Sequence, residues 1–176
     1  MTFLIDWFLI WWLRHGRYGW SKIRRWLFER KYLSTALPEV KSIEGIETTL
    51  HKITWTMDGP LHLFDCISYP QTTWVKKKDD CDGFAMLAAE LLNILNPNYN
   101  PVLLTALVHP IRYSHTICAF TPQEGNLWYF DNYSLKSENL ENYEDIVKTI
   151  TKDRHLVCWD VRNPINFDMI EFHNNK

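Results

Sequence analysis

The apolar patterns along the chain predict an α+β fold, in which helical segments come first and an antiparallel sheet follows. Apolar residues between 84 and 95 recur at helical spacing, which predicts a half-buried helix that begins near residue 81. Two later runs, 114–120 and 127–131, have the composition of strands, and the segment between them contains Pro and Gly, which indicates a hairpin. The length of 176 residues is enough for one domain with a full hydrophobic core.

The chain is expected to divide into a helical extension, residues 1–38, and a main domain, residues 39–176. Pro38 is expected to end the extension. Periodicity and turn residues predict the remaining elements of the main domain, in this order: a mostly helical segment over 40–55, a long loop over 59–78, a strand over 101–109, a helix over 138–150 and a final strand over 155–161.

The first 33 residues are unusually rich in tryptophan and in basic side chains. They hold five of the nine tryptophans and seven of the 19 Lys and Arg, against only Asp6 and Glu29, so the segment carries +5 and the remaining chain –7. Two interpretations are open: an amphipathic helix at a membrane interface, or a helix whose tryptophans pack on the main domain. We favour packing, and peripheral contact with a membrane or a partner through residues 1–33 is the alternative.

The same segment does not have the pattern of a secretory signal, because its apolar part precedes its basic part and no small-residue cleavage site follows. Its apolar run, residues 3–13, is interrupted by Asp6 and is too short to span a bilayer. A cytoplasmic location is therefore expected. The net charge of –2 does not suggest a nucleic-acid partner.

Cys81 stands at the start of the predicted helix, three residues before Phe84, and so continues its apolar stripe towards the sheet. The unpaired N–H groups and partial positive charge of a helix N-terminus favour the thiolate, which is the nucleophilic form of cysteine. The plain alternative is a small buried hydrophobe, since the chain has four cysteines and seven histidines. No two cysteines form a CxxC pair, so a structural zinc site is not expected.

The predicted hairpin supplies the partners that a cysteine nucleophile needs. If Phe120 pairs with Asn126, His115 lies opposite Asp131, and residues directly opposite in an antiparallel pair point to the same side. A hairpin loop with an even number of residues would instead send these two side chains to opposite faces. Cys81, His115 and Asp131 then form a set of nucleophile, base and orienting acid.

Three segments of the chain resemble the cysteine, histidine and aspartate motifs of the transglutaminase-like superfamily: Asp-Asp-Cys-Asp-Gly-Phe-Ala, Ser-His-Thr-Ile-Cys-Ala-Phe and Trp-Tyr-Phe-Asp-Asn. Segments 55–58 and 69–72 are similar to those before the cysteine in bacterial and phage transglutaminase-like cysteine proteinases, so the resemblance spans about residues 45–135. It implies a papain-like or transglutaminase-like core, with the cysteine helix packed on an antiparallel sheet. The chain departs from the pattern at Asp79, where Gly is common, and at Gly83, where an acidic residue is frequent.

The resemblance implies a cysteine peptidase or amidase that cleaves amide bonds of a protein or peptide substrate through a thioester. Acyl transfer to an amine and a catalytically silent binding module are the alternatives. The backbone N–H of Cys81 is the expected oxyanion donor, while Gln71 and Trp74 are interpreted as loop and packing residues. Some bacterial relatives bind calcium near acidic residues equivalent to Asp80 and Asp82. Ca²⁺ needs six to eight oxygen ligands, so we interpret these two as helix-capping carboxylates and expect neither a metal ion nor a cofactor.

Overall fold

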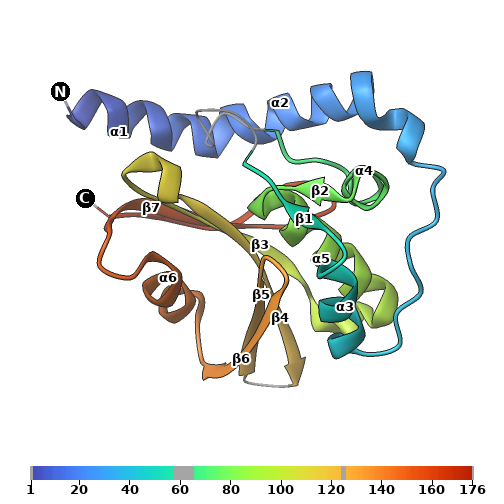
Figure 1. The fold of residues 1–176 in the computed structure, drawn as a ribbon. Helices are drawn as coiled ribbons and strands as arrows, with labels where there is room; N and C mark the ends of the chain where they lie inside the picture. The colour runs from blue at the N-terminus through green and yellow to red at the C-terminus, as the bar shows by residue number, and fades with distance from the viewer. Residues whose placement is uncertain (1, 58–65, 124–125, 176) are drawn as a thin grey trace.

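The computed structural model describes residues 2–57, 66–123 and 126–175 of the chain. Its centre is an antiparallel sheet in the order β6-β5-β4-β3-β7-β8, covered by helices (Figure 1). The strands are β3 (Val102–His109), β4 (His115–Gln123), β5 (Asn126–Asp131), β6 (Ser134–Leu140), β7 (His155–Arg162) and β8 (Met169–Asn174). The predicted α+β class is therefore confirmed.

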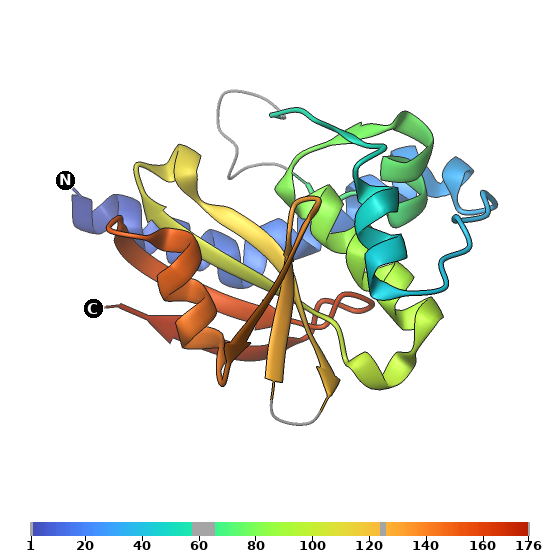
Figure 2. The same cartoon turned by 60° about the horizontal axis from the view of Figure 1, so that its bottom comes forward.

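Helices cover both faces of this sheet, as Figure 2 shows. Helices α3 (Ile43–Leu50), α4 (Pro70–Lys76) and α5 (Cys81–Leu95) lie on one side, and α6 (Tyr143–Thr151) lies on the other. A hydrophobic core lies on each face of the sheet, and alternate residues of β4 point into one or the other. Cys118 and Phe120 pack with α5, whereas Ile117 and Ala119 pack with α6.

The chain enters α5 through a two-stranded parallel pair, β1 (Thr54–Trp55) and β2 (Lys78–Asp79). Asp80 then caps α5, because its carboxylate accepts the backbone N–H of Asp82 at 3.1 Å. The apolar positions of α5 are buried almost without interruption, so the helix is a central element of the larger core. The first residue of this helix is Cys81, as predicted.

The N-terminal segment is an almost unbroken helical rod that runs from strand β7 to helix α4, coloured blue in Figure 1. It consists of α1 (Thr2–Trp11), the π-helical turn η1 (Trp12–Gly16), α2 (Arg17–Arg24), the π-helical turn η2 (Arg25–Glu29) and the 3₁₀ turn η3 (Arg30–Tyr32). Every fourth side chain of the rod is buried: Leu9, Leu13, Arg17, Ser21, Arg25 and Glu29.

A spacing of four residues would rotate around a regular helix, which has 3.6 residues per turn. The two π-helical turns are wider, with i→i+5 hydrogen bonds, and they offset this rotation. The buried row therefore stays on one side of the rod along its whole length. Two of its six members are apolar and four are polar or charged, so the rod is bound to the main domain by hydrogen bonds as well as by apolar contacts.

Four expected elements differ from the structure. The helix expected over 40–55 is confined to Ile43–Leu50, where Ser42 accepts the backbone N–H of Gly45 and fixes its start. The expected loop over 59–78 contains α4, and the part of that loop at 58–65 lies outside the described residues.

The other two differences lie near the sheet edges. The helix expected over 138–150 begins only at Tyr143, capped by Asn142, because the chain first forms edge strand β6. A further edge strand, β8, follows the strand that we expected to be the last. Both strands are half exposed and polar, so they lack the apolar runs from which inner strands are predicted.

Candidate active site

His115 and Asp131 meet at one end of the sheet, where β4 begins and β5 ends. The His115 Nε2 atom lies 2.7 Å from Asp131 Oδ1, so the two side chains share a hydrogen bond. The predicted pairing of these two side chains on one face is therefore present. Their strands, however, are not in the predicted register.

Ala119 pairs with Tyr129 instead of Leu127, which shifts the expected register by two residues. The strands also pair at Gln123 and Asn126, and continuing that pairing would place His115 and Asp131 on opposite faces. A β-bulge between Phe120 and Gln123 adds one residue to β4 and restores the common face. The predicted contact between His115 and Asp131 is therefore present, whereas the predicted register is wrong.

The sulfur of Cys81 completes the group from the other side of the sheet. Helix α5 packs on the face that carries Cys118, whereas His115 belongs by alternation to the opposite face. Cys81 nevertheless interacts with His115, because one residue is the first of its helix and the other is the first of its strand. The contact therefore forms at the end of the sheet and not across one of its faces.

The electrostatics of His115 favour the imidazolium. Burial lowers the pKa of this histidine, but hydrogen bonds with Asp131 and Cys81 outweigh burial and raise its pKa to about 10. The hydrogen bond from His115 in turn lowers the pKa of Asp131, against the opposing effect of burial. Since Nε2 faces Asp131, the ring nitrogen left for the thiol is Nδ1. One ring thus joins the carboxylate to the sulfur.

The three side chains line a cleft of about 640 Å³. Aromatic side chains form part of its wall, among them Trp55, Tyr113 and Tyr129. Its charged lining is mainly basic, and consists of Arg112, Lys136, Lys152 and Arg154 beside Asp131 and His115. Gln71 and Trp74 are not among the lining residues. Trp74 packs against the larger core as expected, whereas Gln71 lies in helix α4 and not in a loop.

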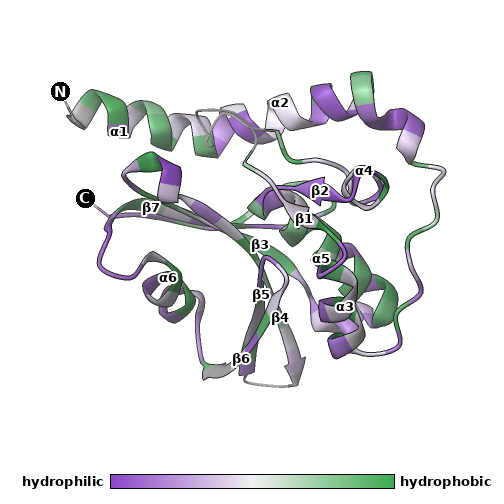
Figure 3. Cartoon of the chain, in the orientation of Figure 1, coloured by the Kyte–Doolittle hydropathy of each residue, from purple (hydrophilic) through white to green (hydrophobic). Residues whose placement is uncertain are grey.

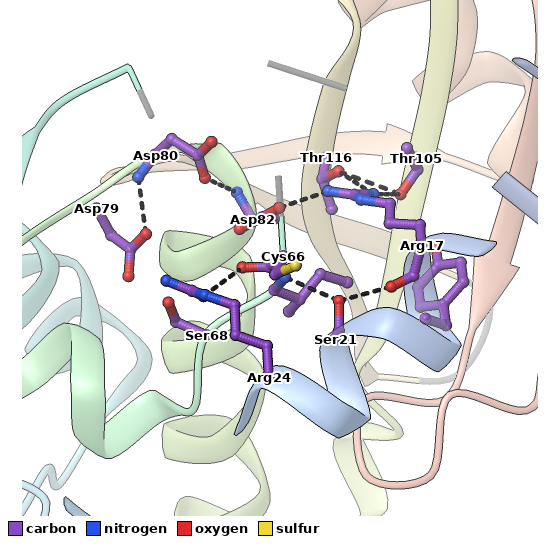
Figure 4. A network of polar contacts seen from close by, with 12 residues as sticks. Arg17, Ser21, Arg24, Cys66, Ser68, Asp79, Asp80, Asp82, Thr105 and Thr116 are labelled. Carbon is purple, nitrogen blue, oxygen red and sulfur yellow. Dashed lines mark hydrogen bonds and ion pairs between the residues drawn. The ribbon is translucent and has the colours of Figure 1, made fainter. Parts of the chain in front are cut away.

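Three carboxylates lie close to Cys81 in the chain, and Figure 4 shows Asp79, Asp80 and Asp82 together with Arg17. Ligand oxygens of Asp79, Asp80 and Asp82 lie within 4.8 Å of one another, and all three residues are buried. Asp79 Oδ2 accepts the hydroxyl of Thr73 at 2.6 Å, and Asp82 Oδ2 accepts a guanidinium N–H of Arg17 at 2.5 Å.

These three carboxylates form a group of possible metal ligands, and one of them, Asp82, is already bound by a cation of the chain itself. Arg17 supplies the positive charge that the buried carboxylates require.

Arg17 is the residue of this region that sequence reasoning missed. It is 4% exposed, and besides Asp82 it donates to the hydroxyls of Thr105 and Thr116, at 3.4 and 3.3 Å. Burial lowers the pKa of Arg17, but the charges around it, Asp82 first and Cys81 among them, outweigh burial and raise that pKa. The N-terminal rod thus places a permanent cation beside the sulfur.

A signal for Arg17 was present in the sequence. Leu9 and Leu13 begin a row of four-residue spacing, and Arg17, Ser21 and Arg25 continue it. Polar residues that continue the four-residue spacing of buried leucines are expected to face the main domain as well. Both Ser21 and Arg25 bind the backbone of residues 67–68. Ser21 Oγ accepts the N–H of Ile67 at 3.0 Å, and Arg25 donates to Ile67 O at 2.7 Å and to Ser68 O at 2.6 Å.

No family model and no curated protein sequence matches the chain. Among solved structures, calcium-bound LapG from Legionella pneumophila is similar to it, with a TM-score of 0.48 and 15% identity over 66% of this chain and 62% of LapG. EGTA-treated LapG gives a TM-score of 0.49 and 15% identity over 76% of this chain and 66% of LapG. The matched region is therefore less than two thirds of LapG.

Proposed function

We propose that the chain is a cysteine hydrolase of the transglutaminase-like type, which cleaves amide bonds in proteins or peptides. The observation that carries the proposal is the His115 ring, which interacts with the Asp131 carboxylate and with the Cys81 thiol at the end of a helix. A nucleophile, a base within reach of it and a group that orients the base are what covalent catalysis by a thiol requires.

In the proposed reaction the Cys81 thiolate attacks the carbonyl carbon of the substrate and forms a carbon–sulfur bond. His115, protonated by the thiol, gives its proton to the leaving amine as the carbon–nitrogen bond breaks. Water then attacks the thioester while His115 takes one of its protons, and the acid product and the thiol are released. Asp131 keeps the imidazole oriented and stabilises its charged form throughout.

Two further groups have roles in this proposal. The backbone N–H of Cys81, at the first position of α5, donates to the oxygen that becomes negative during attack. Arg17 is a positioning residue, because its guanidinium fixes Asp82, the neighbour of the nucleophile, and places positive charge near the thiolate.

The basic lining of the cleft suggests the class of substrate. Arg112, Lys136, Lys152 and Arg154 surround it, whereas its carboxylate, Asp131, is engaged by His115. Acidic peptides are therefore the expected substrates, and a peptide with Glu or Asp near the scissile bond should be cleaved faster than its Lys counterpart. Lys136→Gln should weaken this preference, whereas Lys148→Gln, on the exposed surface of α6, should leave it unchanged.

The first test is the reactivity of the four cysteines. Iodoacetamide at pH 6, followed by peptide mapping, should modify Cys81 first. Burial raises the pKa of Cys118 and raises that of Cys158 to about 12, so both should react slowly. Faster labelling of another cysteine, or no labelling of Cys81 in the folded protein, would favour the binding-module alternative.

The second test follows turnover of a pool of acidic peptides with and without a fluorescent primary amine. New peptide N-termini that Cys81→Ala no longer produces support the hydrolase, and Cys66→Ser is the matched control. Incorporation of the amine without release of free acid would instead identify an acyl transferase, since water and amine use the same triad.

A further inference from the structure

The N-terminal rod leaves one face uncovered, and this face is strongly apolar. Exposed large apolar side chains occur along residues 4–33: Leu4, Ile5, Trp7, Phe8, Trp11, Trp20, Ile23, Trp26, Leu27, Phe28 and Leu33. So many exposed large apolar side chains in one short segment are rare on a protein that acts alone in water and indicate an interaction site.

The arrangement of this face follows from the buried row. Because the buried side chains recur every four residues, residues two positions further along lie half a turn away and point outward. That outward row contains Trp7 and Trp11 near the start of the rod and Ile23 and Leu27 further along, with the exposed His15 and Gly19 between them. The tryptophans predicted to pack on the main domain are therefore mostly turned away from it.

The charge of the uncovered face has one sign. Arg14, Lys22, Arg30 and Lys31 are exposed on the rod. Of its two acidic residues, Glu29 is buried, and Asp6 lies within hydrogen-bond distance of His109, at 2.7 Å. Figure 3 shows apolar residues dominant in α1 and hydrophilic residues more frequent towards α2 and beyond.

We propose that this face of the rod docks on an anionic lipid surface, with the apolar side chains in the interface and the basic side chains on the headgroups. Trp, Leu and Phe beside Lys and Arg are the composition of interfacial helices, and the two attractions together give stable binding where either alone is weak. Among the described residues no helix combines the length and apolar character needed to cross a bilayer, so the rod would lie along the surface.

Docking in this way would leave the cleft accessible. None of the residues that line the cleft belongs to the rod, while the buried side of the rod carries Arg17 to the acidic cluster beside Cys81. Membrane contact and the proposed catalysis therefore use separate surfaces, and each can be tested without the other.

The test is co-sedimentation of the full chain with large vesicles of phosphatidylcholine alone or with about one third phosphatidylglycerol. We expect the protein to pellet with the anionic vesicles, and to do so less in 0.5 M than in 0.15 M NaCl, because salt screens the headgroup charge. Trp7→Ser with Trp11→Ser should reduce the partition coefficient at least about tenfold. Both side chains are about half exposed, so the fold should persist, which circular dichroism would verify.

Two controls make the result specific. Ile165→Ser removes a highly exposed apolar side chain outside the rod and should not change binding. Lys22→Gln with Lys31→Gln should weaken binding to anionic vesicles only. The proposal is overturned if the full chain stays in the supernatant, if the tryptophan variant pellets as well as wild type, or if light scattering shows a dimer that this variant dissociates.

Discussion

The ion pair between Arg17 and Asp82 should be the strongest single polar contribution that holds the N-terminal rod beside the candidate site. The two side chains are 5% and 2% exposed, so water screens their attraction little. Arg17→Met would leave the Asp82 carboxylate buried without its cation. Breaking a buried pair in this way costs roughly 3–5 kcal/mol, and we expect a loss of that size in the free energy of unfolding.

For a chain of this length, each kcal/mol lowers the melting temperature by about 2–4 °C, so the single variant should melt roughly 6–20 °C lower. Asp82→Asn should also destabilise, because it leaves the buried guanidinium without the carboxylate that balances its charge. The double variant should recover much of the loss, since neutral groups in place of both charges need no counter-charge. The Oγ1 atoms of Thr105 and Thr116 lie 3.1 Å apart, so the two hydroxyls remain hydrogen-bonded to each other when Arg17 is replaced.

The assay is a double-mutant cycle by urea denaturation at pH 7. We expect an interaction energy of about 2–4 kcal/mol between the two sites. The matched control is the pair Glu144 and Lys148, whose side chains are 64% and 67% exposed, and whose cycle should show no measurable coupling. If the Arg17 and Asp82 variants are additive within about 0.5 kcal/mol, the reasoning is refuted.

The same variants test the positioning role. Loss of the Arg17 charge should move the pH profile of Cys81 alkylation to higher pH, because a nearby cation favours the thiolate. A purely structural role predicts that the profile stays unchanged in the fraction of Arg17→Met that remains folded.

Two other predictions concern the neighbourhood of the cysteine. A Cβ at Gly83 would lie 2.1 Å from Cγ of Asp79, so Gly83→Ala should destabilise the protein by roughly 1–3 kcal/mol. Gly19 has open space around it, so Gly19→Ala should stabilise the protein by about 0.5–1 kcal/mol. Urea denaturation midpoints measure both effects, and equal effects of the two variants would contradict the packing argument. Asp131→Asn should lower the pKa of His115 from about 10, as NMR titration would show, and should reduce turnover roughly 10²–10⁴-fold. Because the folded-state pKa of His115 is raised, the contribution of this histidine to the free energy of unfolding is complete below pH 6.5 and is lost as pH rises towards 10. If the free energy of unfolding of the wild type rises with pH over this window, the raised pKa of His115 is contradicted.

The departures from expectation at Gly83 and in the hairpin have local physical causes. At Gly83, the Asp79 side chain occupies the space that a Cβ would need. In the hairpin, a bulge compensates for the turn, so the common face of His115 and Asp131 was predicted correctly although the pairing was not.

The sequence by itself determined the features that depend on near neighbours in the chain. The start of α5 at Cys81 follows from a capping residue and an apolar stripe. Strand β3 follows from an apolar run. The two-residue period of strands predicted the common face of His115 and Asp131, but the structure reaches that face through a bulge in β4. Each of these is decided within about 20 residues of chain, where spacing translates directly into direction.

Only the tertiary structure decided which surfaces meet. The contact of Arg17 with Asp82 joins residues 65 positions apart, and it forms because two π-helical turns keep the buried row of the rod on one side. The approach of Cys81 to His115 depends on how a helix end and a strand end are placed, although their faces differ. Such contacts come from the packing of whole elements, and packing is set by burial and shape over the entire chain and not by local spacing.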